Sequence, residues 1–253
     1  MEGPSLHLAA EQLQPFVGKR VKAVFGNTTI DQERLKGQVV QRIFAWGKHL
    51  VIQFDGSALR VHFLLFGSFE ADVLGITVTG DYKRSREPRL ALTFPNGELR
   101  TYTCSVVHLE TKDARKLYDR SVDVLARQWD PQQALERMGK TPDERITDVL
   151  LDQEVFAGVG NIIKNEVLSL ERVHPATPIK DLRPAQRKAL VKRARTFSQQ
   201  FLRWRRAFVL LKHLRIHRKS RCPHCDGPVK HEKVGKRKRM AHYCPKCQPL
   251  GKT

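Results

Sequence analysis

The pattern of hydrophobic and polar residues divides the chain into two halves with different periods. Up to about residue 120, short apolar runs with partial alternation predict β-strands, most clearly at 21–25, 49–54, 59–63 and 90–94. Asp55-Gly56-Ser57 and Pro95-Asn96-Gly97 lie between such runs and suit hairpin turns. One helix is expected before the strands, with a buried stripe drawn from Leu6, Leu8, Ala9, Leu13 and Phe16.

The second half follows the period of helices. Thr141-Pro142-Asp143-Glu144 reads as a capping box with proline at the first helical position, and predicts a helix to about Gln153. A second helix follows Gly158-Val159-Gly160-Asn161, and a longer one starts at Pro184. The longer helix has an apolar stripe made by Leu190, Ala194, Phe197, Phe201, Trp204 and Phe208. The change of period places a domain boundary near residues 120–135.

Charge narrows the classes of partner. The 253 residues include 46 Lys and Arg against 26 Asp and Glu, a net charge of +20. Between Arg183 and Arg221 there are fourteen Lys or Arg and no acidic residue. Such an excess favours a polyanionic partner, DNA above all, although a charged run is more often only a solvated face.

No apolar run approaches the length of a membrane span, and the first residues have neither a basic nor an apolar signal region. We therefore expect no membrane partner and no secretion. The expected location is the bacterial cytoplasm, with the nucleoid, or the nucleus of a eukaryote.

Four of the five cysteines form a metal-binding pattern. Cys222 and Cys225 make one C-x2-C pair, Cys244 and Cys247 make the second, and 18 residues separate the pairs. Four thiolates close a tetrahedral site with no open position, so the pattern predicts one structural Zn2+ per chain. The alternative is two disulfides or free thiols. Cys104 stands alone in a strand and is expected in the core.

Gly158-Val159-Gly160-Asn161 joins two predicted helices. Glycine permits left-handed geometry or the close approach of another backbone, and Asn161 is placed to cap the next helix, whose free N–H groups suit a phosphate. An ordinary corner in a helical bundle explains the segment equally well.

Taken in order, the Glu2-Gly3-Pro4 start, the helix–Gly-x-Gly-Asn–helix segment and the four-cysteine finger with Arg239 resemble the Fpg/Nei family, the formamidopyrimidine-DNA glycosylase and endonuclease VIII group. The resemblance spans the whole chain. It implies an α+β fold with an N-terminal β-sandwich catalytic domain (1–125), a helix-two-turn-helix DNA-binding domain (126–219) and a zinc finger hairpin (220–253). It also implies a monomer that flips a damaged base out of DNA.

The resemblance assigns roles to individual residues. Glu2 matches the family's catalytic acid and base, and Lys48 matches a lysine that contacts phosphate and assists elimination. Asn161 and Arg239 match the residues that clamp the phosphates around the flipped nucleotide, with Arg239 also counted in the catalytic set. Arg120 matches a further arginine that contacts DNA. Lys48 and Arg120 have a plainer reading as surface charges, and Glu2 as an ordinary terminal residue.

Two further segments bear on substrate choice. Leu64, followed by Leu65 and Phe66, lies where family members fill the gap left by the flipped base; a buried strand end is the equal alternative. The arginine-rich loop of the 8-oxoguanine branch has no counterpart, because Thr103-Cys104-Ser105-Val106 stands there. This favours the endonuclease VIII side, and hence oxidised pyrimidines.

The start of the chain departs from the family pattern. Members usually begin Met-Pro-Glu-Gly-Pro and use the proline amine as nucleophile, whereas Met1 directly precedes Glu2 here. The expected nucleophile is therefore the α-amine of Met1, which can form the Schiff base of the family's glycosylase and lyase reaction.

Three other functions remain open from the sequence. Lys48 can act as a substitute nucleophile, which would give lyase activity with weak base excision. The fold can also serve damaged-DNA binding without catalysis. A basic zinc-ribbon protein that binds RNA or the ribosome is more distant, because it leaves the set Glu2, Lys48, Asn161 and Arg239 unexplained.

Overall fold

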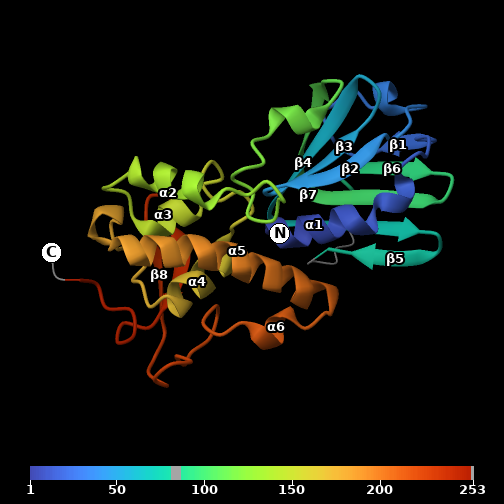
Figure 1. Ribbon diagram of the computed structural model, residues 1–253. Helices are drawn as coiled ribbons and strands as arrows, with labels where there is room; N and C mark the ends of the chain where they lie inside the picture. Colours follow the sequence, from blue (N-terminus) through green and yellow to red (C-terminus); the bar gives the residue numbers. More distant parts are fainter. Residues whose placement is uncertain (81–86, 252–253) are drawn as a thin grey trace. The chain divides into compact units, whose positions relative to one another are not determined.

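The computed structural model describes residues 1–80 and 87–251, and these form two compact units. The first unit contains Met1 and Gly3–Asp119, and the second contains Glu2 and the chain from Arg120 onward. The α+β fold expected from the sequence is confirmed (Figure 1). The finer division at residues 125 and 219 stays a prediction.

In its described residues, the first unit contains one α-helix, three short 3-10 helices and a folded β-sheet. The sheet order is β1-β6-β7-β4-β3-β2, and β5 pairs with β4. The elements are α1 (Gly3–Gln12), β1 (Ala23–Phe25), β2 (Arg42–Trp46), β3 (His49–Gln53), β4 (Ser57–Val73), β5 (Ile76–Thr79), β6 (Leu90–Phe94) and β7 (Gly97–Glu110). All four strand segments predicted from the sequence fall on strands, and both predicted hairpin turns join strand neighbours.

The two longest strands let the sheet fold over its own core. β4 and β7 pair from Ser57↔Glu110 to Phe63↔Cys104, and again from Ser68↔Tyr102 to Val73↔Gly97, with a register shift between the two stretches. Apolar side chains of both stretches enter one buried cluster with Leu6, Leu13 and Phe16. The cluster includes Cys104, whose thiol donates to Thr101 Oγ1 at 3.3 Å, as expected for a core cysteine.

The second unit is helical and ends in a hairpin. Its elements are α2 (Pro131–Gly139), α3 (Ile146–Leu150), α4 (Asn161–Leu170), α5 (Pro184–Arg206), α6 (Leu210–His213), β8 (Lys230–Val234) and β9 (Arg239–Tyr243). One apolar cluster joins the helices, and a smaller one surrounds Ile216 and the cysteines. None of the helices in the described ranges is both long enough and apolar enough to cross a membrane.

Two helix predictions in this unit are wrong in part. The segment around Pro142 is not helical, because its backbone bonds to a distant segment: Lys180 N–H donates to Pro142 O and Ile179 N–H to Glu144 O, at 2.8 and 2.9 Å. The helix therefore begins at Ile146 and ends at Leu150. Phe208 was expected on the buried stripe of α5, but it lies beyond the helix end and is 88% exposed.

Candidate functional site

The carboxylate of Glu2 caps helix α4. Its Oε1 accepts the N–H of Ile162 at 2.6 Å, and its Oε2 accepts the N–H of Ile163 at 3.2 Å. These N–H groups belong to the first turn of the helix, where they have no partner within it. The positive end of the helix dipole also faces this carboxylate. Glu2, 9% exposed, is thus held in a setting that favours its negative charge.

The two glycines before α4 serve different purposes. Gly158 has φ +97°, a left-handed conformation that favours glycine. Gly160 has an ordinary φ of −119°, but a Cβ there would overlap the carboxyl group of Glu2. The expected close approach is therefore real, although the approaching group is a side chain and not a backbone.

Asn161 does not cap the helix as expected. The capping position is Gly160, which offers no side chain, and Glu2 takes the N–H groups that seemed available for a phosphate. Asn161 instead accepts a hydrogen bond at Oδ1 from Lys164 Nζ, at 3.0 Å. This bond fixes the amide so that its NH2 group points away from Lys164.

Lys164 links α4 to the hairpin. Its Nζ also donates to the carbonyl of Met240 at 3.2 Å, next to Arg239 at the start of β9. The side chain is fully buried, and burial lowers its pKa from 10.5 to about 7. Glu2 and Arg239 both lie close enough to influence that pKa electrostatically. Within the second unit, the structure thus gathers Glu2, Asn161 and Arg239 around one buried amine.

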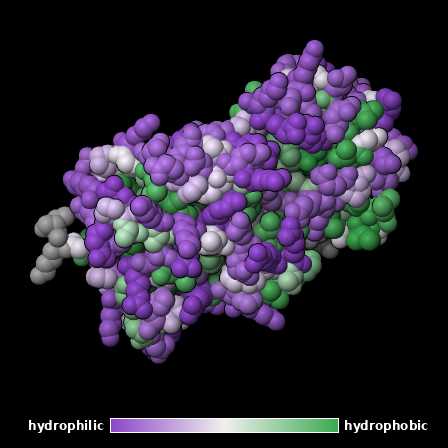
Figure 2. Space-filling model, in the orientation of Figure 1, coloured by the Kyte–Doolittle hydropathy of each residue, from purple (hydrophilic) through white to green (hydrophobic). Residues whose placement is uncertain are grey.

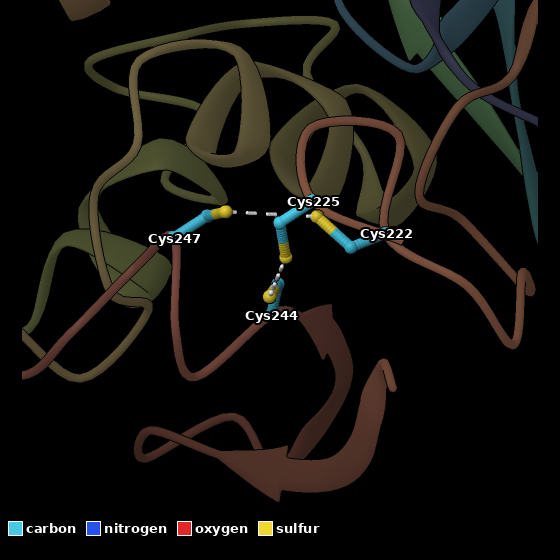
Figure 3. A group of neighbouring side chains, drawn as sticks. All are labelled: Cys222, Cys225, Cys244 and Cys247. Carbon is cyan, nitrogen blue, oxygen red and sulfur yellow. Dashed lines mark hydrogen bonds between the residues drawn. The ribbon is translucent and has the colours of Figure 1, made fainter. Parts of the chain in front are cut away.

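The four finger cysteines converge on one point, as Figure 3 shows. The sulfur atoms of Cys222 and Cys247 lie 3.9 Å apart, and those of Cys225 and Cys244 lie 3.6 Å apart. Disulfide sulfurs are about 2.05 Å apart, so these pairs are not disulfides. A tetrahedron with metal–sulfur bonds of about 2.3 Å has edges of about 3.8 Å. The cluster therefore fits one tetrahedrally held metal ion.

Lys48 lies in the first unit, in the tight turn between β2 and β3. Its carbonyl is 3.1 Å from Nδ1 of His62 on the neighbouring strand β4. The pKa of His62 is lowered chiefly by burial, while the charges of Lys48 and the Met1 amine lower it further and the hydrogen bond opposes them. Within the first unit, the charges of the Met1 amine and of Lys48 thus act on the same imidazole.

Leu64 lies in the bulge between the two paired stretches of β4. Leu64, Leu65 and Phe66 are 48%, 57% and 48% exposed, so this segment is not a buried strand end. Figure 2 shows a largely hydrophilic surface around scattered apolar patches. Adjacent exposed apolar residues of this kind often mark an interaction site.

Arg120 opens the second unit. Its Nε donates to Oε1 of Gln128 at 3.2 Å, and its side chain is half-buried. The contact is local and assigns no chemistry to this arginine.

Known proteins resemble the chain in sequence. Residues 120–205 match the formamidopyrimidine-DNA glycosylase H2TH domain. Endonuclease 8-like 3 of Mus musculus is 32% identical over 216 residues, which cover 84% of this chain and 35% of that protein. Endonuclease 8-like 2 of Bos taurus is 33% identical over 199 residues, covering 76% and 58%. Endonuclease 8 2 of Mycobacterium bovis is 28% identical, with 85% of each protein covered. The chain thus contains an H2TH domain of the formamidopyrimidine-DNA glycosylase type and resembles the Fpg/Nei family in sequence.

The fold of the chain agrees with that resemblance. The crystal structure of Lactococcus lactis formamidopyrimidine-DNA glycosylase, bound non-covalently to DNA containing an AP site, superposes with a TM-score of 0.83 at 21% identity. The match covers 98% of this chain and all of that one. Two of the relatives named above are endonuclease 8-like proteins, so the resemblance lies with the endonuclease VIII side of that family. The chain spans little more than a third of the mouse relative.

The structure adds residues that sequence reasoning missed. Lys164 gives a weak signal, a lysine three positions after Asn161 on the apolar side of a helix. His62 gives none, because a histidine in an alternating strand is ordinary. The cross-strand pairing of His49 with His62, and the contact of the His62 ring with the Lys48 carbonyl, show that His62 lies beside Lys48.

Proposed function

We propose that this protein is a DNA N-glycosylase and abasic-site lyase of the Fpg/Nei family that removes oxidised bases, preferentially pyrimidines, and acts as a monomer. The observation that carries the proposal is the Glu2 carboxylate, seated on α4 beside Asn161 and next in the chain to the Met1 amine. The names of the relatives and the AP-site DNA in the Lactococcus lactis structure support it.

The proposed reaction begins with the Met1 α-amine. Its nitrogen attacks C1′ of the damaged nucleotide, and the base leaves with the electron pair of the glycosidic bond. The sugar ring then opens as its oxygen takes up a proton, leaving an imine between Met1 and C1′. A proton then passes from C2′ to solvent, the C3′–O bond breaks, and the 3′ phosphate leaves with that electron pair, which cuts the strand.

Glu2 moves the protons in this sequence. Two backbone N–H donors and a helix N-terminus favour the carboxylate form, so the resting group is a base. Glu2 accepts a proton released by the attacking amine and then delivers it to the ring oxygen. Its order of action is base first and acid second.

The remaining candidates bind the DNA. Asn161 presents its NH2 group and Arg239 its guanidinium to phosphates beside the flipped nucleotide, while Lys48 and Arg120 add phosphate contacts. Leu64 and its exposed neighbours enter the space left by the flipped base. The net charge of +20 supplies sequence-independent affinity.

The metal in the cysteine cluster is zinc under this proposal. Four thiolates with no open position suit a structural zinc ion, and it takes no part in the reaction. When bound, it stiffens the base of the β8–β9 hairpin that carries Arg239.

Borohydride trapping tests the proposal. The protein is mixed with a duplex containing an abasic site or an oxidised pyrimidine, the imine is reduced, and the adduct is mapped by peptide mass spectrometry. We expect one adduct, on Met1. An adduct on Lys48 would instead support the substitute nucleophile, and tight binding without any adduct would leave a damage-binding protein.

Glu2→Gln separates the chemistry from binding. The amide keeps the size of the side chain but cannot act as the base, so adduct formation is expected to fall at least about a hundredfold. Affinity for a duplex with a tetrahydrofuran abasic analogue is expected to stay within about threefold. Unchanged strand cleavage by this variant would exclude the role assigned to Glu2.

A further inference from the structure

The turn of the β8–β9 hairpin, residues 235–238, rests on a buried carboxylate. Asp148 of α3 is 7% exposed, and its two oxygens accept successive backbone N–H groups. Lys236 N–H donates to Oδ2 at 2.9 Å and Arg237 N–H donates to Oδ1 at 3.2 Å. One carboxylate therefore holds the peptide backbone at the tip of the finger.

Gly235 shows how closely the two parts fit. It has φ +80°, and a Cβ there would overlap the carboxyl group of Asp148. The side chain of Lys236 also bonds to Glu144, which lies four residues before Asp148 in the chain. The turn is thus docked onto the segment from Glu144 to Asp148 by backbone and side chain together.

Arg239 lies between two anchors. On one side Arg237 is held by Asp148, and on the other the carbonyl of Met240 accepts from Lys164 Nζ at 3.2 Å. Lys164 bonds Asn161 as well. A two-stranded hairpin alone is only marginally stable in water, so these anchors decide where Arg239 points relative to Asn161.

The negative charge of Asp148 allows two explanations of its position to be told apart, because they predict opposite effects of its removal on DNA binding. A carboxylate beneath Lys236, Arg237 and Lys238 weakens the attraction of this turn for phosphate. Simple electrostatics therefore predicts tighter DNA binding when Asp148 is removed. If the carboxylate instead places Arg239, its removal has the opposite effect.

We propose that Asp148 is a positioning residue for DNA binding, which docks the hairpin turn on α3 and thereby sets Arg239 in register with Asn161 on one stretch of phosphate backbone. The inference rests on the proposed function, in which Arg239 and Asn161 contact those phosphates. Asp148 itself touches no DNA.

The test compares Asp148→Ala with Asp143→Ala. Both variants lose one carboxylate from the same segment, but Asp143 is exposed and pairs only with Lys180 among the contacts described for it. Affinity for a tetrahydrofuran duplex is measured by fluorescence anisotropy over a range of salt. Asp148→Ala is expected to bind about tenfold more weakly, with a salt slope lowered by about one, because one phosphate contact is lost. Asp143→Ala is expected to bind as tightly as the wild type or slightly more so.

A double-mutant cycle identifies the route of the effect. In an Arg239→Ala background, Asp148→Ala is expected to add little further loss, because both changes remove the same contact. Asp148→Ala that binds as well as Asp143→Ala, or a loss that is equally large in both backgrounds, would overturn the proposal.

Gly235→Ala tests the same proposal by a second route, which is needed if the Asp148→Ala protein loses its metal. It keeps the net charge and the carboxylate but drives the turn away from Asp148, so weaker binding is again expected. Gly37→Ala is the matched control, since Gly37 has a similar φ of +82° with nothing near its Cβ position. Equal binding by the two glycine variants would refute the positioning role.

The proposed function and the positioning role of Asp148 can be refuted independently of each other. Wild-type protein that gives no borohydride adduct refutes the glycosylase and lyase activity whatever Asp148 does. Conversely, an active protein in which Arg239→Ala weakens binding and Asp148→Ala does not would refute only the positioning role.

Discussion

Because Lys164 is buried, its titration is expected to make the free energy of unfolding rise with pH. Burial lowers its pKa from 10.5 to about 7, with Arg239 adding to the fall and Glu2 and Asp148 opposing it. In the unfolded chain the same lysine titrates near its ordinary value of about 10.4. Between pH 7 and pH 10 the unfolded state therefore holds more protons than the folded state, and stability rises with pH.

The magnitude follows from the two pKa values. One pKa unit is worth 1.36 kcal/mol, so the fall from 10.5 to about 7 corresponds to about 5 kcal/mol over the full titration. About 2.5 kcal/mol of this falls between pH 6 and pH 9. The cost of the buried charge is thus largest at acidic and neutral pH, and is relieved as Lys164 loses its proton.

Lys164→Met isolates this contribution. Methionine keeps an unbranched apolar side chain in the same space but does not titrate. The free energy of unfolding in urea is measured for wild type and variant at pH 6, 7, 8 and 9. The wild type is expected to gain about 2.5 kcal/mol relative to the variant across this range. The finger thiolates titrate in both proteins and cancel in the difference.

Lys188→Met serves as the control, because Lys188 is exposed on α5. Its difference from wild type is expected to stay level with pH. A difference between wild type and Lys164→Met that is equally level would refute the reasoning, since Lys164 would then titrate in the folded protein as it does in the unfolded chain.

Two further predictions concern the contact between Glu2 and Gly160 and the metal in the cysteine cluster. Gly160→Ala places a methyl group against the Glu2 carboxyl group. This variant is expected to slow borohydride trapping at least about tenfold with little change in DNA affinity. Gly139→Ala is the control and is expected to trap as fast as the wild type, because Gly139 has open space around it. Equal trapping rates in the two variants would show that the position of the Glu2 carboxylate against Gly160 does not affect the reaction. Chelation is expected to release one metal ion per chain, measured by elemental mass spectrometry, and to weaken DNA binding, while Cys104→Ala keeps its metal because Cys104 lies in the core of the first unit. Metal-free protein that binds DNA as before would contradict the structural role of the metal.

The local elements of the fold could be predicted because their signals are local. Strand alternation and the hairpin turns at Gly56 and Asn96 located the strands, and the spacing of the cysteines located the metal cluster. The same local reasoning failed around Pro142, where the capping-box pattern is real but backbone bonds to residues 179 and 180 take its place. It also missed α2, although Asp130 followed by Pro131 is a strong start signal.

The site could be predicted only as a set of residues. Glu2, Asn161 and Arg239 come from the family resemblance, but no pattern shows that Glu2 caps α4 or that Asp148 holds Lys236. These contacts join residues 160 and 88 positions apart. Likewise, the sequence gives only a weak signal that Lys164 is buried, namely its place on the apolar side of a helix, because burial depends on tertiary packing.

The cap that Glu2 forms on α4 has a consequence for synthesis of the protein. The ribosome adds Ile162 and Ile163, the partners of Glu2, about 160 residues after Glu2 itself. The first unit can complete its sheet before those partners exist, since the strands described for it, β1 to β7, pair with one another. Assembly of the proposed catalytic centre is thus a late event, and it waits for the second unit to fold.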